Sequence, residues 1–286
     1  MQLNQTVEDP KLRALFQNKD FRKALSIAAD REEICSLVFD GFSEPTQASP
    51  ASGAQGYSQA WTKKWTEYDP AQARKILESI GLKMGSDGYF DYADGSDLLI
   101  EILSYDETSE TSKVAELLTE KYFKNVGIKA TFSVRDRSLI DDLSRANKLV
   151  AVLSPVAPME TISISLRPDT LVPVRNYAVW YGTYGDWYST DGKTGMEPTG
   201  DMKKLIDLYR DMLSATDKAS INKIAAEMLK LHEENIWQIG YASDSPTLFA
   251  VNNDLKNFPM SSIYCDEFRG LGIAHMHTAY FASDKQ

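Results

Sequence analysis

Short apolar strands alternate with amphipathic helices between Leu98 and Leu153, and this alternation restricts the fold more than any other feature of the chain. The pattern predicts, in chain order, a strand at 98–105, a helix at about 111–125, a strand at 128–134, a helix around 138–147 and a strand at 149–153. Helices that alternate with strands act as crossover connections. The run therefore indicates an α/β fold, a mixed sheet with helical crossovers.

Sheets of this kind bind ligands beyond the carboxyl ends of their strands. Ser104 to Thr108 lie at the end of the first predicted strand and just beyond it, and further residues follow Leu153 at the end of the third. We expect ligand contacts at these two places. From Pro155 to Thr199 no clean period is visible, which is long for a connection and indicates a binding or lid segment.

Helix signals precede this run. Asp30 and Glu33 have the three-residue spacing of a capping box. A second helix begins at Asp69 as N-cap, with Pro70 at its first position. The polar stretch 43–57 between them contains several Pro and Gly residues and predicts a surface loop.

Two amphipathic helices follow Thr199. The first is predicted to turn one apolar face inward, made of Met202, Leu205, Ile206, Tyr209, Met212 and Leu213. The second, at about 217–234, presents Ile221, Ala225, Met228 and His232. Two strand-like stretches, 236–242 and 248–252, come next.

Charge and hydropathy exclude several classes of partner. With 31 basic and 41 acidic residues the net charge is −10, so the chain lacks the basic surface that binding to nucleic acid needs. Its apolar runs are far shorter than the roughly 20 residues of a spanning helix. The opening residues lack the features of a secretion signal. We expect either a cytoplasmic protein or a piece of a longer one.

Six aromatic residues crowd the fourteen positions from Asn176 to Ser189. Rigid rings beside glycines and an aspartate suit stacking against a sugar ring or an extended peptide. A locally packed loop core explains the same composition equally well. Both interpretations stay open.

No residue set here indicates catalysis, a metal or another cofactor. His275 and His277 form a pair without a signalled third ligand, and His232 lies on an apolar helical stripe. The two cysteines, Cys35 and Cys265, are too far apart for a metal knuckle and are expected to be free or buried thiols. The motifs of common hydrolase, kinase and nucleotide-binding sites are absent.

Three motifs resemble family 5 solute-binding proteins of ABC importers, the receptors for oligopeptides, dipeptides, nickel and oligosaccharides. They are FRKALSIAADR at Phe21–Arg31 with Gly41 beyond it, YDPAQARKILESIG at Tyr68–Gly81, and NVGIK at Asn125–Lys129. The resemblance extends from about Asn18 to Pro259. It implies a periplasmic or cell-surface binding protein with no catalytic activity, whose partners are a peptide or oligosaccharide solute and the membrane permease of an importer.

The resemblance also implies a domain organisation. Family members close a solute between two lobes of a type II periplasmic-binding-protein-like fold, and this chain resembles the second lobe. Residues 1–17 are then a linker from a missing first lobe, residues 18–240 the second lobe, and residues 241–286 a hinge and a segment that returns to the first lobe.

Departures from the family pattern point to the ligand class. Oligopeptide receptors have a Gly-Trp segment and an aspartate after the strand that corresponds to 149–153, whereas this chain has Ser154 to Met159, with Glu160 as the nearest acid. The lost acid and the gained aromatics favour an oligosaccharide over a peptide. The expected ligand-binding residues are Ser154, Pro155, Met159, Glu160, Trp180, Tyr181, Tyr184, Asp186, Trp187 and Tyr241.

Two other functions remain as alternatives. A stand-alone cytoplasmic ligand-sensing or interaction domain derived from the same lobe would fit the missing export signal. A glycoside hydrolase is the remote alternative, supported only by acids near aromatics. Its activity requires two carboxylates that face each other across a cleft at about 5 to 9.5 Å.

Overall fold

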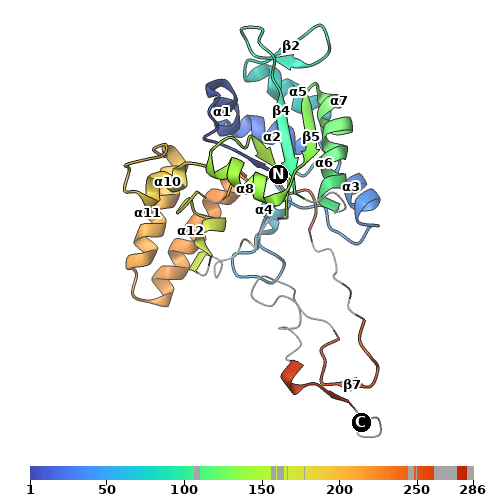
Figure 1. Cartoon of the computed structure of the whole chain (residues 1–286), viewed down its shortest axis with the longest axis vertical. Helices are drawn as coiled ribbons and strands as arrows, with labels where there is room; N and C mark the ends of the chain where they lie inside the picture. The colour runs from blue at the N-terminus through green and yellow to red at the C-terminus, as the bar shows by residue number, and fades with distance from the viewer. Residues whose placement is uncertain are drawn as a thin grey trace. The chain divides into compact units, whose positions relative to one another are not determined.

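The computed structural model describes residues 1–105, 110–155, 159, 164–165, 167–176, 178–243, 248, 250–260 and 276–281. The chain divides into two compact units, Met1–Asp244 and Ser245–Gln286 (Figure 1). Unit 2 contains a small antiparallel pair, β7 (Leu255–Lys256) and β8 (Tyr280–Phe281), next to the short helix η5 (Met276–Thr278). The first unit carries the main sheet.

Four strands form this sheet in the order β1-β6-β4-β5. Their bounds are β1 Gln2–Leu3, β4 Ile100–Ser104, β5 Ala130–Val134 and β6 Ala151–Val152. β4 runs parallel to both β5 and β6, with Ile102 opposite Phe132 and Ala151, while β1 is antiparallel to β6. The predicted mixed sheet with helical crossovers is confirmed.

Residues 1–17, expected as a linker, instead pack into unit 1. β1 extends the sheet, and α1 (Pro10–Gln17) buries Leu12, Leu15 and Phe16 in the core. Met1, Leu3 and Val7 are buried as well, and the burial of these apolar residues ties the start of the chain to the sheet.

The first crossover contains an irregular turn. It consists of α6 (Glu110–Leu117), the π-helical turn η1 (Leu118–Phe123) and α7 (Lys124–Val126), and it ends at Gly127 with φ 83°. The helix expected at about 111–125 is confirmed, with a π turn in its middle. The second crossover, α8, covers Arg137–Arg145 (Figure 1).

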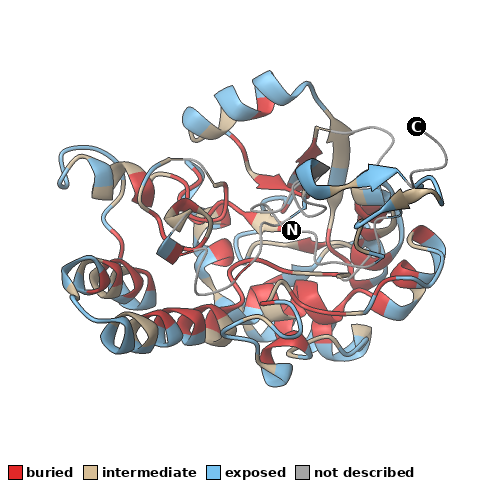
Figure 2. Ribbon diagram, turned by 90° about the horizontal axis from the view of Figure 1, so that it is seen from below, coloured by how far each residue is buried: buried red, intermediate tan, exposed pale blue. Residues whose placement is uncertain are grey.

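Alternate residues of β4 enter two different cores. Ile100 and Ile102 belong to the main hydrophobic core, whereas Leu103 packs with Ile140 of α8 and Val179 in a second cluster. Because side chains alternate along a strand, helices cover both faces of the sheet. Figure 2 shows buried residues along the strands and on the inner sides of the helices.

The N-terminal helices follow the capping signals. α2 (Lys19–Ile27) precedes α3 (Arg31–Val38), whose N-cap Asp30 accepts a hydrogen bond from the Glu33 N–H at 3.0 Å. Asp69 caps α5 (Pro70–Ser79) in the same way through the Gln72 N–H at 2.8 Å. The loop predicted at 43–57 contains no helix and no strand. The remaining short elements are α4 (Gln59–Thr62), β2 (Lys83–Met84) and β3 (Phe90–Asp91).

α11 (Gly200–Ser214) and α12 (Lys218–Asn235) are the two predicted amphipathic helices, and they pack against each other. One expected inward residue, Leu213, is 62% exposed. Successive helical residues lie about 100° apart, so Leu213 turns to solvent when its neighbour Met212 faces the core. The segment before these helices contains the short helices η2 (Pro168–Thr170) and α10 (Tyr184–Ser189).

The strand expected at 236–242 does not form. Ile236 adopts a left-handed conformation with φ 44°, and the segment makes a single isolated bridge, between Gln238 and Gln2. The Gly240 N–H donates to the side chain of Gln47 at 2.9 Å, so it is unavailable for a strand ladder. Within 248–252 the described residues, 248 and 250–252, form no strand either.

Candidate functional site

The carboxyl ends of three parallel strands meet at one edge of the sheet. Ser104, the last residue of β4, lies opposite Val134, the last residue of β5. The Leu153 N–H donates to the carbonyl of Leu103 at 3.0 Å, so β6 ends level with β4. The Arg135 N–H donates to the carbonyl of Ser104 at 2.9 Å. This edge, which we call the carboxyl edge, brings together both places at which the sequence predicts ligand contacts.

Polar and charged groups line the carboxyl edge. Ser104 is buried, Ser154 is half-buried and Pro155 is exposed. The guanidinium of Arg137, at the start of α8, lies 4.9 Å from the ring centroid of Tyr105, which is a cation–π distance. The edge therefore offers the hydroxyl group of Ser154, an aromatic ring and a positive charge. Residues 106–108 lie outside the described part of the chain.

Arg135 and Arg137 were missed as candidate residues. Both are exposed and directly follow β5, in the sequence VRDR. Two arginines beyond the second predicted strand were a usable signal, because the carboxyl end of that strand meets the same edge as the others. The prediction considered only the residues after the first and third strands.

Trp180 and Tyr181 belong to the core. Both rings are fully buried, and the Trp180 ring stacks on Trp237 at 5.6 Å between ring centroids. The Tyr181 hydroxyl donates to the carbonyl of Asp169 at 2.8 Å. A ring without exposed area cannot stack on a solute, so the packed loop core accounts for these two residues.

Three more expected site residues are also buried. Tyr184 accepts a hydrogen bond from Gln17 at 2.9 Å, and burial raises the pKa of its phenol. Tyr241 is 4% exposed, with the guanidinium of Arg31 5.2 Å from its ring centroid. Met159 is 2% exposed. Glu160 lies outside the described residues.

Asp186 and Trp187 on α10 remain partly accessible. The Asp186 carboxylate accepts a hydrogen bond from Asn176 at 3.0 Å, and burial raises its pKa. Two cations of α11 lie near the Trp187 ring, Lys203 at 5.9 Å and Arg210 at 5.6 Å from its centroid. Of the expected aromatic residues, Trp187 alone among those described keeps a partly exposed ring.

His232 and Cys35, two titratable residues of the core, are in their neutral forms. Burial lowers the pKa of His232 to about 4, and its Nε2 lies 2.7 Å from the carbonyl oxygen of Leu171. Burial also raises the pKa of the Cys35 thiol to about 11, so it is a poor nucleophile. Within the described residues, no group of three or more His, Cys, Asp and Glu side chains could hold a metal ion. Cys265 and His275 fall outside these residues.

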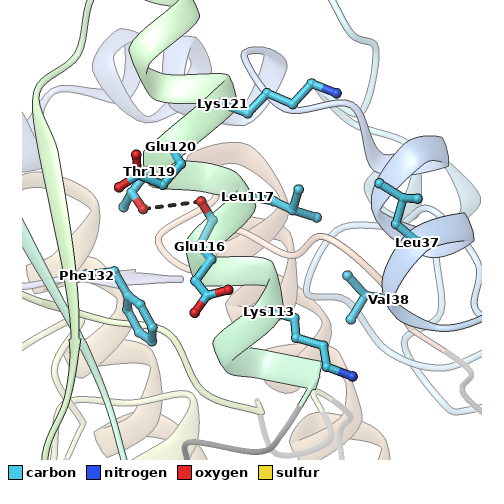
Figure 3. Close-up of a pocket in the computed structure, with 9 residues that line it drawn as sticks. All are labelled: Leu37, Val38, Lys113, Glu116, Leu117, Thr119, Glu120, Lys121 and Phe132. Carbon is cyan, nitrogen blue, oxygen red and sulfur yellow. Dashed lines mark hydrogen bonds between the residues drawn. The ribbon is translucent and has the colours of Figure 1, made fainter.

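A hollow of about 610 Å³ lies elsewhere, along α6 and η1. Figure 3 shows Leu117 pointing toward Leu37 and Val38 of α3, while Glu116 and Phe132 lie on the other side of the helix. The helix therefore separates the two groups of lining residues. None of the predicted site residues lines this hollow.

No described helix is both long enough and apolar enough to span a membrane.

Comparison with solved structures identifies similar folds. The chain superposes on the oligopeptide-binding protein OppA with a TM-score of 0.75 and 30% identity, covering 90% of this chain and 42% of that protein. It superposes on the periplasmic binding protein MelB of Agrobacterium fabrum C58, solved with stachyose, with a TM-score of 0.66 and 22% identity. That match covers 84% of this chain and 37% of MelB.

Sequence comparison gives a consistent result. The periplasmic alpha-galactoside-binding protein of Rhizobium meliloti is 21% identical over 256 residues, which are 87% of this chain and 35% of that protein. The chain thus spans less than half the length of each of these three relatives. The model of the middle part of the bacterial extracellular solute-binding proteins, family 5, matches residues 1–159. This match covers more than half of the chain and includes all four strands of the main sheet, and the chain belongs to this family.

Proposed function

We propose that this chain is part of the solute-binding component of an ABC importer, and that the solute contacts it at the carboxyl edge. The observation that carries the proposal is the meeting of β4, β5 and β6 at an edge with polar and charged side chains, in a chain of family 5. Tyr105, Arg135, Arg137 and Ser154 are the contacting residues; Pro155 lies beside them, and the buried Ser104 ends β4 next to Tyr105. The function is capture without chemical conversion.

The solute class that fits this edge best is an oligopeptide. The preference for an oligosaccharide had two grounds, the lost acid after the third strand and the gained aromatics, and the burial of Trp180 and Tyr181 removes most of the second. Arg135 and Arg137 are exposed cations that can pair with a carboxylate, which a peptide has and a neutral sugar lacks. The similarity to an oligopeptide-binding protein at 30% identity agrees with this assignment.

The proposal also covers location and partners. A solute-binding component of this family acts outside the cytoplasmic membrane and delivers its solute to a membrane permease. Unit 1 then corresponds to the second lobe, and the segment from 241 onward to the hinge and the return to the first lobe. Trp187 and Asp186 on α10 are secondary candidates for solute contact.

Solution NMR of this chain tests the proposal, because chemical shifts detect even weak binding. We expect pentaalanine to shift the amide signals of Ser104, Tyr105 and Ser154 in a saturable manner, and stachyose to shift them less. Arg137→Ala should weaken the effect of pentaalanine at least fivefold. Arg145→Ala, at the opposite end of α8 and also exposed, is the matched control and should leave it unchanged.

Three results would contradict the proposal. Saturable shifts confined to residues around Leu37 and Leu117 would move the site to the hollow along α6. Stronger shifts with stachyose than with pentaalanine would return the solute class to oligosaccharides. A lack of shifts with either solute at millimolar concentration would remove the carboxyl edge as the contact surface.

A further inference from the structure

Two arginines are buried in unit 1 without an acidic partner. Arg22 and Arg31 are each 1% exposed, and no carboxylate of the described residues lies within 4.0 Å of either guanidinium. Burial lowers the pKa of both to about 10, so both stay charged at neutral pH. A buried charge normally needs a charged partner or a full set of hydrogen bonds. Here carbonyl oxygens supply the hydrogen bonds.

Each arginine donates two hydrogen bonds to one backbone carbonyl at the end of α12 or just after it. The Nε and Nη2 of Arg22 donate to the carbonyl of Asn235 at 3.2 and 3.0 Å. The same two nitrogens of Arg31 donate to the carbonyl of Gly240 at 3.1 and 2.9 Å. A guanidinium is planar and can donate two hydrogen bonds to one oxygen. Each pair of hydrogen bonds therefore fixes the direction of the carbonyl relative to the guanidinium plane as well as its distance.

The other donors of each arginine hold it to the helix that precedes its own. Nη1 of Arg22 donates to the carbonyl of Phe16 at 2.7 Å. Nη1 and Nη2 of Arg31 donate to the carbonyl and the hydroxyl of Ser26 at 2.8 and 2.7 Å. Arg22 is therefore oriented by α1 and Arg31 by α2, and these contacts do not involve the segment that follows α12.

The backbone from Asn235 to Gly240, the two residues whose carbonyls accept these hydrogen bonds, has a conformation that its sequence does not favour. Ile236 is β-branched, 1% exposed and left-handed, with φ 44° and ψ 58°, a region that such residues rarely adopt. Gly240 passes so close to the backbone of Gln47 and Ala48 that a Cβ atom would collide with them. A conformation of this kind persists only where its surroundings determine it.

We propose that Arg22 and Arg31 are positioning residues that together fix the path of residues 235–240, which we call the arginine clamp. This segment is the last part of unit 1 before its boundary at Asp244. The clamp therefore determines where the chain leaves unit 1. If the proposed function holds, it also sets the starting direction of the hinge; this consequence alone rests on that function.

Amide hydrogen exchange of the whole chain, measured by NMR without any solute, tests the clamp. Arg22→Lys and Arg31→Lys keep the charge but cannot donate two hydrogen bonds from one planar group. In either variant we expect the amides of Ile239 and Gly240 to exchange at least tenfold faster. The exchange rates of the Ile102 and Leu103 amides in β4 should rise only as far as the loss of global stability accounts for.

Ile102→Val is the matched control. It removes one methylene from a fully buried residue of β4 and should change protection in β4 and at Ile239 by the same factor. If the arginine variants behave like this control, the arginines only contribute to general stability and the clamp is refuted. If exchange at Ile239 and Gly240 does not change, it is refuted as well.

The unmodified chain provides a second test that does not depend on whether a variant folds. The Nε–H signals of Arg22 and Arg31 should be visible at pH 7 and protected from exchange, unlike that of the exposed Arg145. Rapid exchange of the two buried groups would contradict the clamp. Because no solute is present in these measurements, their outcome is independent of the pentaalanine titration.

Discussion

His232 shows how one buried side chain connects distant parts of unit 1. It lies on α12, its Nε2 donates to the carbonyl of Leu171, and its ring meets Trp180 and Trp237 at 5.3 and 5.1 Å between centroids. The imidazole is 2% exposed, so its charged form would lose hydration that no neighbouring carboxylate replaces among the described residues. Its neutral form is therefore part of the fold.

The lowered pKa of His232 predicts acid sensitivity. In the unfolded chain this residue takes up a proton near pH 6.5, whereas in the folded chain its pKa is about 4. The unfolded state thus binds more protons between these values, and the free energy of unfolding should fall as the pH drops from 6.5 to 4, by about 3 kcal/mol at pH 4. Above pH 7 this contribution is constant.

Urea unfolding of the wild type and of His232→Gln at several pH values checks this prediction. The glutamine can donate to Leu171 but does not titrate, so other acid-sensitive groups cancel in the difference between the two proteins. The stability difference should shift in favour of the variant as the pH falls. A difference that stays constant from pH 7 to pH 4 would show that His232 does not titrate abnormally.

Among the elements, α5 is the clearest product of local sequence signals. Asp69 caps it, Pro70 opens it, and Ala73, Ile76 and Leu77 turn inward. The Asp69 carboxylate accepts from one of the N–H groups that a helix leaves without partners at its start. The helix therefore begins where the sequence predicts it.

Replacing this cap should destabilise unit 1. We expect Asp69→Ala to lower the free energy of unfolding by about 1 kcal/mol, measured by urea denaturation at pH 7. Gln72→Ala is the control, because its side chain is exposed and alanine is an excellent helix former, and it should change stability by less than half as much. Equal effects of the two substitutions would contradict the capping role.

The first crossover shows the limit of local patterns. The apolar spacing at 111–125 predicts a helix but does not distinguish an α turn from the π turn at Leu118–Phe123, since the two periods differ little over so short a stretch. Glu33 of α3 accepts hydrogen bonds here from Lys121 at 2.5 Å and Tyr122 at 2.7 Å. These contacts join residues 88 and 89 positions apart, which no local pattern reveals.

At the scale of the whole molecule, the buried core of the described residues lies in unit 1. Every buried residue that the structure describes falls between Met1 and Tyr241. The main sheet and the arginine clamp also lie in this range. Unit 2 contains a two-stranded sheet, which is marginally stable at best when isolated.

Unit 1 should therefore fold without unit 2. We expect a chain truncated after Asp244 to unfold cooperatively, with the same thermal midpoint as the full chain within experimental error. Circular dichroism at 222 nm during heating measures both proteins. A clearly lower midpoint, or loss of cooperative unfolding, would mean that unit 2 contributes to the stability of the first unit.

The sequence by itself determined those features that depend on near neighbours along the chain. The helix starts at Asp30 and Asp69, the helix stop at Gly127 and the order of strands and crossovers all follow from hydrogen bonds or apolar periods within a few residues. The carboxyl edge follows from that order. The family resemblance, carried by motifs in the same segments, was confirmed.

Tertiary structure alone decided which face of each segment is covered. From the sequence, Trp180 and Tyr181 are as suitable for a binding surface as for a core. The packing of Trp237 and α12 places them in the core. Ile236 interrupts an apparent strand because Arg22 and Arg31 hold carbonyls more than 200 positions away. Burial and long-range hydrogen bonds join residues that no local pattern relates, so the packed fold alone could reveal them.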